Sequence, residues 1–496
     1  MKIEKKHITR FLRIKFRYIL YAFLLIACIL LSIAEISNQL QKNNAGSFDA
    51  RIEDQAITLQ WKIPAKQAVL SITGPSIEYE ETVESIGQYR FTKGKHSEVY
   101  AFELTYIDHK GKQIKKQLER IFLDFNQLPN LTTIVIETLD HKDLEYKYIH
   151  KPQIYIGETI TKNYKRATFN NIPIKIRVRG NTSTLLPKKS YKIHFKKRMD
   201  LMNLGDEYAD RDWYLLAGGD NLKTYFALQV AAVLKIGWEP RMRFVNLILN
   251  GNWMGVYMLS ESIKAHPKRC RISKTGYLIE HDPYFWSMKG LYFKSTLLDK
   301  NLGFTFKYPE ITSPYDPQFL AVKDQIKSFE KLLKQNSPEM YNFIDIDTFA
   351  LWGLAHEIMG TWDSAGSNIY FYKYSVNKKH KLKMGPLWDF DTLFQMKDHE
   401  HSRIYSEKMS YFTFLLRNPM FRNVYKQKYL SISKSLEEKM RIRLDTVQNI
   451  PGLEKSRELD SKIWKNKYIP IRSEIENLML HLHRRIIFLD DEISRL

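Results

Sequence analysis

Two short segments in the last third of the chain carry the acidic and amide side chains that phosphoryl transfer requires. One reads GTWDSAGSN over 360–368, and the other reads GPLWDFD over 385–391. Asp363 precedes Asn368 by five residues, the spacing of a catalytic base and a metal-binding asparagine in kinase catalytic loops. Phosphoryl transfer asks a protein mainly to hold Mg²⁺ and to orient the attacking hydroxyl. We therefore expect Asp363 to be catalytic.

The stretch between these segments predicts a hairpin that brings them together. Residues 369–375 and 381–388 are strand-like, with a polar turn between them. A hairpin centred on that turn would place Asn368 opposite Asp389, with Cα atoms about 4.5–5.5 Å apart. An amide oxygen and a carboxylate at that distance can share one Mg²⁺, which takes oxygen ligands. We expect the two residues to share a cation site.

The elements upstream follow the order of a kinase small lobe. A lysine-bearing strand comes after a glycine-containing loop, and a helix and a hairpin follow. We expect Asp220 to be the N-cap of the helix, and Asn250-Gly251 between apolar runs is a strong hairpin signal. The expected elements are strands over 174–179 and 190–195, a helix over 221–237, and hairpin strands over 244–250 and 253–263.

The part of the chain beyond this small lobe reads as mainly helical. Amphipathic helices are expected over 317–335 and 346–360, and several more over 407–496. The basic stretch LHLHRRIIF at 480–488 is expected to be a solvated helix face rather than a binding patch.

Short alternating strands between residues 49 and 125 predict a separate β-module. Turn signals such as those at 109–112 separate the strands, which is the spacing of an antiparallel sandwich. Trp61 and the segment at 100–111 resemble a fibronectin type III or immunoglobulin-like module. We interpret it as a spacer.

Residues 18–34 form an uncharged apolar run that could span a membrane. Seven basic residues precede it, so the positive-inside rule places the rest of the chain outside the membrane. We favour an uncleaved anchor. Ser32-Ile33-Ala34 also resembles a signal-peptidase site and Cys28 loosely fits a lipobox, so a secreted or lipid-anchored form stays open.

The composition favours an anionic partner. Lysine and arginine total 77 against 55 acidic residues among 496, a formal charge of +22. The basic residues are spread along the chain without a recognisable nucleic-acid module, so no nucleic acid is expected. The two cysteines, Cys28 and Cys270, provide no disulfide framework.

Four motifs in order resemble the CotH kinase family, named for a spore-coat protein. They are RGNTS at 179–183, PKKSY at 187–191, NG followed by GVY and Glu261 over 250–261, and PLWDFD at 386–391. Leu387 is inserted in the last motif relative to the family pattern. The resemblance covers about residues 130–400. It implies an atypical kinase fold with a reduced ATP site, in proteins that phosphorylate serine or threonine of secreted or surface proteins.

The resemblance also implies a role for each motif residue. Asp389 is the principal metal ligand, and Asn368 and Asp391 assist it, so ATP and Mg²⁺ or Mn²⁺ are the expected cofactors. Lys189 is the expected phosphate-contacting lysine, with Lys188 and Lys192 as alternatives. The expected ATP-binding residues are Arg179, Gly180, Asn181, Ser183, Lys188, Lys189 and Glu261, the last marking the hinge.

Two departures from the kinase pattern keep other functions open. The helix over 221–237 contains no Asp or Glu, so it cannot supply the carboxylate of a kinase-like lysine–glutamate pair. Tyr225 stands where the family often has an arginine. A catalytically weak kinase-fold adhesion or envelope-assembly protein is one alternative, and transfer of another nucleotide-derived group, such as AMP, is another.

The sequence thus predicts an α+β protein with a membrane helix, a β-sandwich module and a bilobal kinase-like domain. The expected parts are a cytoplasmic tail (1–17), an anchor (18–34), a linker (35–48), the β-module (49–125), the kinase domain (126–400) and its helical C-terminal part (401–496). The expected function is that of a membrane-anchored kinase acting outside the membrane on surface or envelope proteins.

Overall fold

The computed structural model describes most of the chain beyond residue 45. The described residues are 46–75, 77–141, 144, 146–150, 158–162, 164–180, 182–282, 285, 291–298, 303–361, 368–388, 390, 393–394, 404–405 and 411–496. The predicted anchor at 18–34 lies outside them. Within them, no helix is both long and apolar enough to cross a bilayer. The chain divides into two compact units, Met1–Leu128 and Pro129–Leu496.

The described part of the first unit consists of one antiparallel sheet of five strands and a short 3₁₀ helix, η1 (Phe125–Gln127). The strands are β1 (Ser47–Glu53), β2 (Ala56–Gly74), β3 (Ile77–Phe91), β4 (Val99–Ile107) and β5 (Gln113–Ile121). The long β2 pairs with β1 through its first half and with β4 through its second half, while β3 follows its other edge. β5 completes the sheet beside β4.

The five strands pair as one sheet, whereas an antiparallel sandwich has two facing sheets, so the predicted sandwich stays unconfirmed. The short strands expected in this module are partly merged, because β2 continues through Pro64 with only a register shift between Lys62 and Gln67 in its pairing with β3. The side chains of Lys116 and Arg120 on β5 donate to carbonyl oxygens at β1, over 2.7 and 3.2 Å. Side chains therefore tie β5 to β1. The likeness to a fibronectin or immunoglobulin-like module stays a prediction.

Seven strands of the second unit close into a barrel, in the order β10-β11-β12-β14-β13-β6-β9. They are β6 (Thr133–Thr138), β9 (Lys165–Phe169), β10 (Ile172–Arg179), β11 (Ser190–Met199), β12 (Asp210–Leu216), β13 (Met242–Leu249) and β14 (Asn252–Glu261). The predicted strands over 174–179 and 190–195 and the predicted hairpin are confirmed. Asn250 (φ 51°) and Gly251 (φ 77°) have the positive φ values that a type I′ turn requires.

A second sheet and a set of helices make up the rest of this unit. The sheet has the order β16-β17-β15-β18-β19, and a separate hairpin pairs β7 (Tyr146–His150) with β8 (Glu158–Lys162). The sheet strands are β15 (Tyr277–Asp282), β16 (Tyr292–Lys294), β17 (Gly303–Tyr308), β18 (Ile369–Lys373) and β19 (Lys383–Met384). The helices are α2 (Lys223–Leu234), α3 (Pro317–Lys334), α4 (Ile346–Met359), α5 (Phe412–Leu415), α6 (Pro419–Gln448), α7 (Leu453–Trp464) and α8 (Ile471–Ser494). The predicted helices over 317–335 and 346–360 are confirmed.

Polar side chains start three of these helices. Asp316, Asp345 and Asn418 accept amide hydrogen bonds at the first turns of α3, α4 and α6. α2 differs, because the predicted N-cap Asp220 instead ends a short 3₁₀ helix, η4 (Ala217–Asp220). The residue before α2 is Leu222, and its amide donates to Glu474 of α8 over 2.9 Å. A carboxylate distant in sequence therefore takes the place expected for Asp220.

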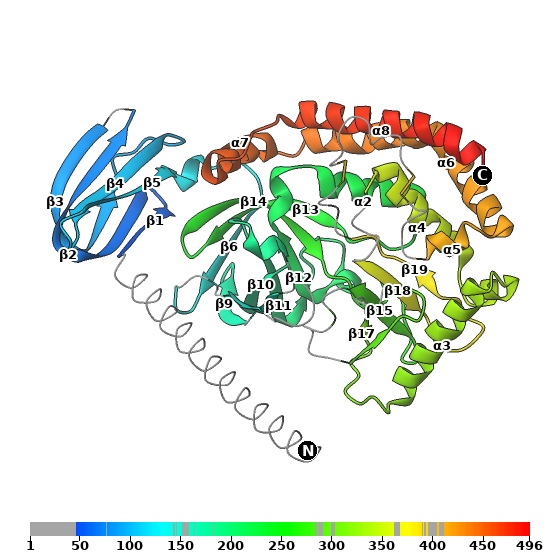
Figure 1. Ribbon diagram of the computed structural model, residues 1–496. Helices are drawn as coiled ribbons and strands as arrows, with labels where there is room; N and C mark the ends of the chain where they lie inside the picture. The colour runs from blue at the N-terminus through cyan, green and yellow to red at the C-terminus, as the bar shows by residue number, and fades with distance from the viewer. Residues whose placement is uncertain are drawn as a thin grey trace, which may run out of the picture. The chain divides into compact units, whose positions relative to one another are not determined.

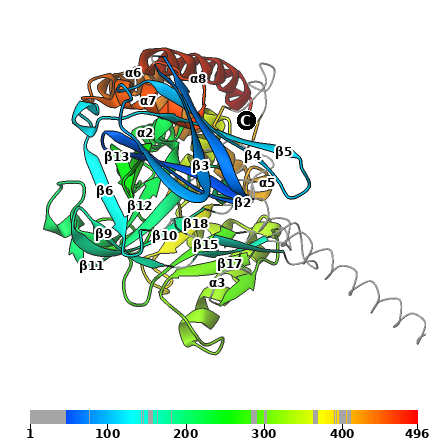
Figure 2. The same cartoon turned by 90° about the vertical axis from the view of Figure 1, so that its left-hand side faces the viewer.

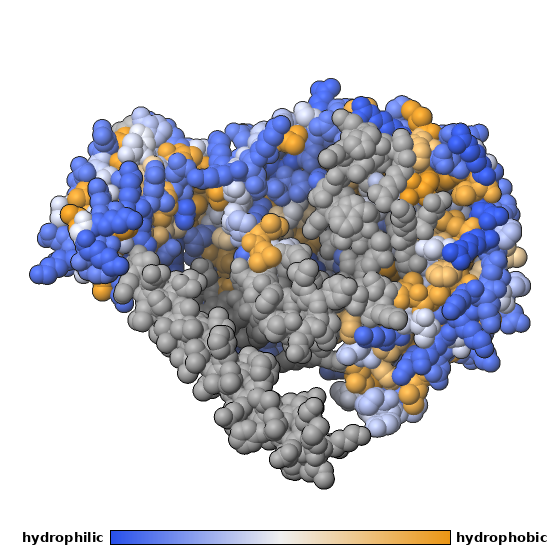
Figure 3. Space-filling view, viewed as in Figure 1, coloured by the Kyte–Doolittle hydropathy of each residue, from blue (hydrophilic) through white to orange (hydrophobic). Residues whose placement is uncertain are grey.

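One apolar core runs from the outer face of the barrel into the helices. Phe244 of β13 and Met258 of β14 belong to it, together with buried residues of α2, α4, α6 and α8. Both ribbon views show α6 and α8 side by side (Figure 1, Figure 2). On the face shown in Figure 3, apolar side chains form separate patches among hydrophilic ones. The sheets and helices therefore bury most of their apolar side chains against one another.

The carboxyl group of Glu239, between α2 and β13, makes stability depend on pH. Burial raises its pKa from 4.5 to about 7, and its Oε1 has no hydrogen-bond partner among the described residues. The folded state therefore binds this proton more tightly than the unfolded state, so stability falls as pH rises from about 4.5 to about 7. Glu239→Gln should remove this loss and stabilise the protein above pH 7 by roughly 3 kcal/mol.

Urea unfolding followed by tryptophan fluorescence at pH 5 and pH 8 measures this effect. Glu438→Gln, at an exposed position of α6, is the matched control. Equal pH dependence in the wild type and the Glu239 variant would contradict the prediction.

Candidate functional site

The outer face of three barrel strands carries a row of cationic and aromatic side chains. Ile176 of β10 and Ile193 of β11 point into the barrel core, so their sequence neighbours face outward. The strand register places Arg177 beside Lys192, and Lys192 beside Tyr214 of β12. Two cations and a phenol therefore share one face.

The next outward residue of β10, Arg179, lies against the fourth motif, PLWDFD at 386–391. Its guanidinium is 4.5 Å from the ring centroid of Tyr214 and 5.4 Å from that of Trp388. The two rings lie 5.8 Å apart. Cation–π attraction favours this arrangement. Trp388 directly precedes Asp389, so the structure brings the predicted ATP-binding Arg179 to the segment of the predicted metal ligands.

Lys192, an alternative in the sequence analysis, belongs to the same face. Its Nζ lies 3.3 Å from Asp212. Burial alone would lower the pKa of Lys192, but Tyr214 and Asp212 outweigh it and hold the pKa above its ordinary value. Lys264 and His194 also contact Asp212, at 2.8 and 3.0 Å. Lys192 is therefore a charged side chain whose carboxylate partner, Asp212, also has Lys264 beside it.

Lys188 forms a buried ion pair with α7 instead of lying on this face. Its side chain is 9% exposed, and its Nζ lies 2.5 Å from Oδ2 of Asp460 on α7 and 2.8 Å from the carbonyl oxygen of Val256. The amide of Val256 donates to the same carboxylate oxygen over 2.7 Å. Burial raises the pKa of Asp460 to about 6, although Lys188 acts in the opposite direction. This lysine joins α7 to β14.

Lys189, the expected phosphate contact, binds its own loop. Its Nζ donates to the carbonyl oxygen of Thr184 over 2.6 Å and to that of Leu186. Gly180 has φ 107°, and a Cβ there would lie 2.1 Å from Oγ of Ser183. Only glycine fits this turn. Lys189 and Gly180 therefore shape the loop, whereas the predicted Asn181 lies outside the described residues.

Glu261, the expected hinge marker, ends β14 with a fully buried side chain. Arg241 donates to both of its carboxylate oxygens, over 2.8 and 2.7 Å. Arg269, also fully buried, lies 3.3 Å from it. Glu261 thus joins β14 to the segments that hold the two arginines. Its predicted part in ATP binding stays a prediction.

The predicted register between β18 and β19 is wrong by two residues. Phe371 pairs with Met384, and continuing that register would place Asn368 opposite Leu387 rather than Asp389. The expected turn was symmetric, but Val376 donates its amide to the carbonyl oxygen of Thr275 over 2.9 Å. This contact with a distant segment moves the centre of the turn.

The predicted catalytic residue and two predicted metal ligands lie outside the described residues. These are Asp363, Asp389 and Asp391. Asn368 is described and has φ 57°, directly before β18. Within the ranges that the structure covers, no three His, Cys, Asp or Glu side chains form a metal-ligand group. A shared cation between Asn368 and Asp389 stays a prediction.

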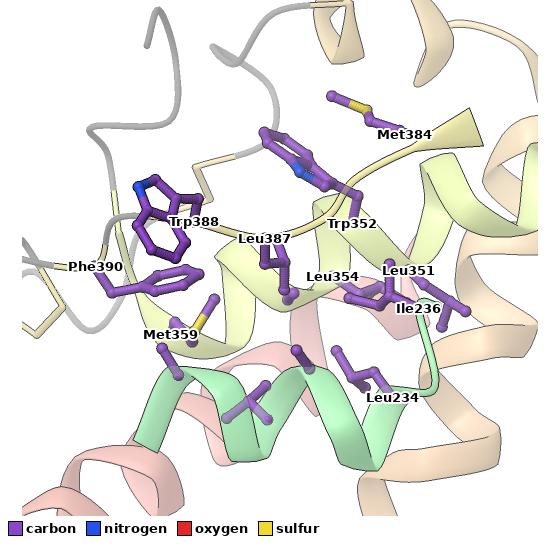
Figure 4. Packing of buried hydrophobic residues seen from close by; sticks show 14 of the residues in the cluster. Leu234, Ile236, Leu351, Trp352, Leu354, Met359, Met384, Leu387, Trp388 and Phe390 are labelled. Atoms are coloured by element: carbon purple, nitrogen blue, oxygen red, sulfur yellow. The ribbon is translucent and has the colours of Figure 1, made fainter. Parts of the chain in front are cut away.

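The apolar residues of the fourth motif, PLWDFD, are buried in the core. Leu387 and Phe390 are 1% exposed and Trp388 is 7% exposed. Figure 4 shows Leu387 and Trp388 on the segment that follows Met384, and the ring of Phe390 close to Met359. The inserted Leu387 therefore adds a core contact. The motif's aspartates lie next to residues that the core holds in place.

A buried histidine beneath this motif is neutral. Burial lowers the pKa of His356 to about 3, and its ring packs between Trp352 and Phe390, with centroids 4.0 and 6.2 Å away. Neither ring nitrogen has a hydrogen-bond partner among the described residues. His356 therefore acts as a packing residue at the end of α4.

The described donors fit a nucleotide with its cation. Arg177, Arg179 and Lys192 supply positive charge on one face, which suits a polyphosphate. The amide oxygen of Asn368 is of the kind that Mg²⁺ accepts. Sequence reasoning missed Tyr214, because the register that sets it opposite Lys192 comes from the pairing of β11 with β12 and not from either strand alone. It also missed Asp460, whose partner Lys188 is 272 positions away and which no local pattern reveals.

Comparison with known proteins agrees with the motifs. A family model described as CotH kinase protein matches residues 176–483, more than half of the chain. The match begins in β10 and ends in α8, so it includes the C-terminal helices. The predicted family is confirmed. No curated protein matches the chain.

Lys188 and Lys192 should respond differently to substitution by methionine. Lys188→Met leaves Asp460 buried without its partner, so it should reduce the free energy of unfolding by about 3 kcal/mol. Lys192→Met should leave stability within about 1 kcal/mol, because Lys264 and His194 still face Asp212. If Lys192 contacts a phosphate of ATP, the substitution should weaken ATP binding about tenfold or more.

Urea unfolding and calorimetric titration with ATP and Mg²⁺ measure the two effects. Lys196→Met, at an exposed position of β11, is the control for both. A Lys188 variant of wild-type stability, or a Lys192 variant of wild-type ATP affinity, would refute the corresponding assignment.

Proposed function

The chain belongs to the CotH kinase family, and from this premise we propose that it is an ATP-dependent protein kinase. Its substrates in this proposal are serine or threonine residues of surface or envelope proteins. Family membership by itself supports an atypical kinase-like protein. The observation that carries the finer proposal is the contact of Arg179 with Tyr214 and Trp388, beside Lys192.

The cationic face would hold the phosphates of the nucleotide. Arg179 is supported by two aromatic rings, so its guanidinium is held in place before a ligand arrives. Lys192 keeps its charge through Asp212 and Tyr214. Fixed positive charges of this kind stabilise the charge that develops on a transferring phosphoryl group. This face thus has the chemistry for positioning ATP.

In this proposal, the polar residues of the segments 360–368 and 385–391 bind the cation and the acceptor hydroxyl. Asn368, Asp389 and Asp391 would hold Mg²⁺ or Mn²⁺, which neutralises the phosphates when bound. Asp363 would accept the hydrogen bond of the acceptor hydroxyl and take its proton as transfer begins. The buried Leu387, Trp388 and Phe390 support the metal-binding segment from below.

The place of action in this proposal is outside a membrane. The apolar run at 18–34 would anchor the chain, with the seven basic residues before it on the cytoplasmic side. The partners would then be nucleotide, the membrane and a surface or envelope protein.

A kinase-fold adhesion or assembly protein is the second candidate. The absence of any acidic residue in α2 favours it, and Tyr225 packs against Phe244 at 5.7 Å between ring centroids. A transferase of another nucleotide-derived group would share the same face. A wild-type protein that binds no nucleotide would favour the adhesion or assembly protein. Transfer of label from α-labelled ATP to a protein would favour the transferase of another nucleotide-derived group.

Asp363→Asn and Asp389→Asn should both abolish transfer, but only the second should greatly weaken Mg²⁺-dependent ATP binding. Asp389 is assigned to the cation that bridges the phosphates, so its loss affects the bound ground state. Asp363 is assigned to the acceptor hydroxyl, which matters mainly in the transition state.

The full chain in detergent, incubated with γ-labelled ATP and Mg²⁺ or Mn²⁺, tests transfer, and calorimetry tests binding. Asp206→Asn, at an exposed position outside both segments, is the control. Transfer by the Asp363 variant would remove that residue from catalysis. A wild type that binds no nucleotide would overturn the kinase proposal.

A further inference from the structure

Helix α8 touches three segments that lead to the candidate site. Near its start, Glu474 accepts the amide of Leu222 at the beginning of α2. Two turns later, the ring of His481 stacks on Phe394, which follows the metal-binding motif, with centroids 5.3 Å apart. One turn beyond that, Arg485 binds the last turn of α4. One side of α8 therefore contacts each segment in succession.

The contact of Arg485 is the most specific of the three. Its Nε donates to the backbone oxygen of Glu357 over 2.9 Å, and its Nη2 donates to Oε2 of the same residue over 3.0 Å. The exposed fractions of the two side chains are 0% and 1%. The expectation that the stretch at 480–488 is a solvated face is therefore wrong for Arg485.

Glu357 binds a third segment through the same carboxylate. The amide of Tyr405 donates to its two oxygens over 2.9 and 3.0 Å. The guanidinium of Arg485 also lies between the rings of Tyr405 and Phe488, 5.3 and 5.2 Å from their centroids. Glu357, Arg485 and Tyr405 thus form one buried cluster, which we call the Glu357 cluster.

The Glu357 cluster fixes the path of the chain out of α4. The backbone oxygen that Arg485 binds also accepts the amide of Gly360, over 3.1 Å. Gly360 has φ 56° and ends the helix, and Thr361 after it is fully buried. Asp363 follows two residues later in the sequence. Arg485 is therefore bonded to the turn from which the chain enters the segment of the predicted catalytic residue.

The ion pair of Arg485 with Glu357 is expected to add little to the stability of the fold. Burial lowers the pKa of Arg485, which reflects the cost of removing a charge from water. A buried ion pair is often no more stabilising than apolar residues of the same shape. The pair instead fixes the orientation of the groups that it joins, because the planar guanidinium of Arg485 can bind the carboxylate and the carbonyl oxygen of Glu357 together only in a narrow range of geometries.

We propose that Arg485 is a positioning residue, which acts through Glu357 to fix the lead-in to Asp363 and the backbone at Tyr405. In this proposal, helix α8 is part of the apparatus for transfer. The inference rests on the proposed kinase function. The contacts of Arg485 with the turn at Gly360 and with Tyr405 can also be tested by a measurement that does not depend on kinase activity.

The test compares Arg485→Met and the milder Arg485→Lys with wild-type full chain. Arg485→Met should lower kcat at least about tenfold and change KM for ATP less than about threefold, because misplacement affects transfer more than binding. Arg485→Lys should restore part of kcat, since it keeps the charge but not the fork. Glu357→Gln should resemble Arg485→Lys.

Hydrogen exchange supplies the readout that does not depend on activity. The amides of Gly360, Thr361 and Tyr405 should exchange at least about tenfold faster in Arg485→Met, while those in the middle of α6 stay protected. The control is Arg441→Met. Arg441 pairs with Glu476 of α8 over 2.7 and 2.9 Å at the surface, so its loss removes an ion pair of α8 without touching α4.

Unchanged kcat and unchanged exchange in both Arg485 variants would overturn the proposal. Equal losses in the Arg441 variant would also overturn it, because they would show a general effect of loosening α8. If the wild type transfers no phosphate, the kinase proposal fails, and the exchange measurement alone decides whether Arg485 fixes the turn. Should Arg485→Met not fold, Arg485→Lys and Glu357→Gln decide the outcome.

Discussion

The buried ion pair between Lys188 and Asp460 joins parts of the second unit that are far apart in sequence. Asp460 also accepts the amide of Val256, and a Cβ on neighbouring Gly255 would lie only 1.9 Å from its Oδ2. Two of the four motifs, PKK and GVY, thus meet at one carboxylate of α7. Separating the pair would leave the charge of Lys188 or of Asp460 buried without a partner, which costs several kcal/mol. The ion pair therefore holds α7 against the barrel.

This constraint reaches α2, the helix without acidic residues. Arg457 of α7 donates to the backbone oxygen of Asp220 over 3.0 and 2.8 Å and pairs with Glu474 of α8 at 2.5 Å. Glu474 in turn accepts the amide at the start of α2. The C-terminal helices therefore supply the carboxylates that α2 lacks. This agrees with a family match that extends to residue 483.

Local sequence patterns predicted many of the helices and strands of the second unit. They did not predict the contacts between segments that are distant in sequence. The hairpin at Asn250 was predictable because two adjacent residues determine its turn. The register between β18 and β19 was not, since a contact with Thr275 displaces the turn. Likewise, Arg485 stands in a basic stretch typical of a solvated helix, and only packing against α4 reveals that it is buried. The motifs predicted the family correctly, but they could not distinguish Lys192, the proposed phosphate contact, from Lys188, which pairs with Asp460 in the core.

Desolvation separates those lysines. If Lys188 turned toward a phosphate, Asp460 would remain at 0% exposure without its cation, so the cost would oppose ligand binding. Lys192 can turn at lower cost, because Lys264 stays 2.8 Å from Asp212. A lysine that binds phosphate must give up its contact with a carboxylate of the protein. The free-energy cost of this exchange is small only where a second cation stays beside that carboxylate. By this reasoning, Lys192 is better suited than Lys188 to bind a phosphate, because its carboxylate partner, Asp212, is shared with Lys264.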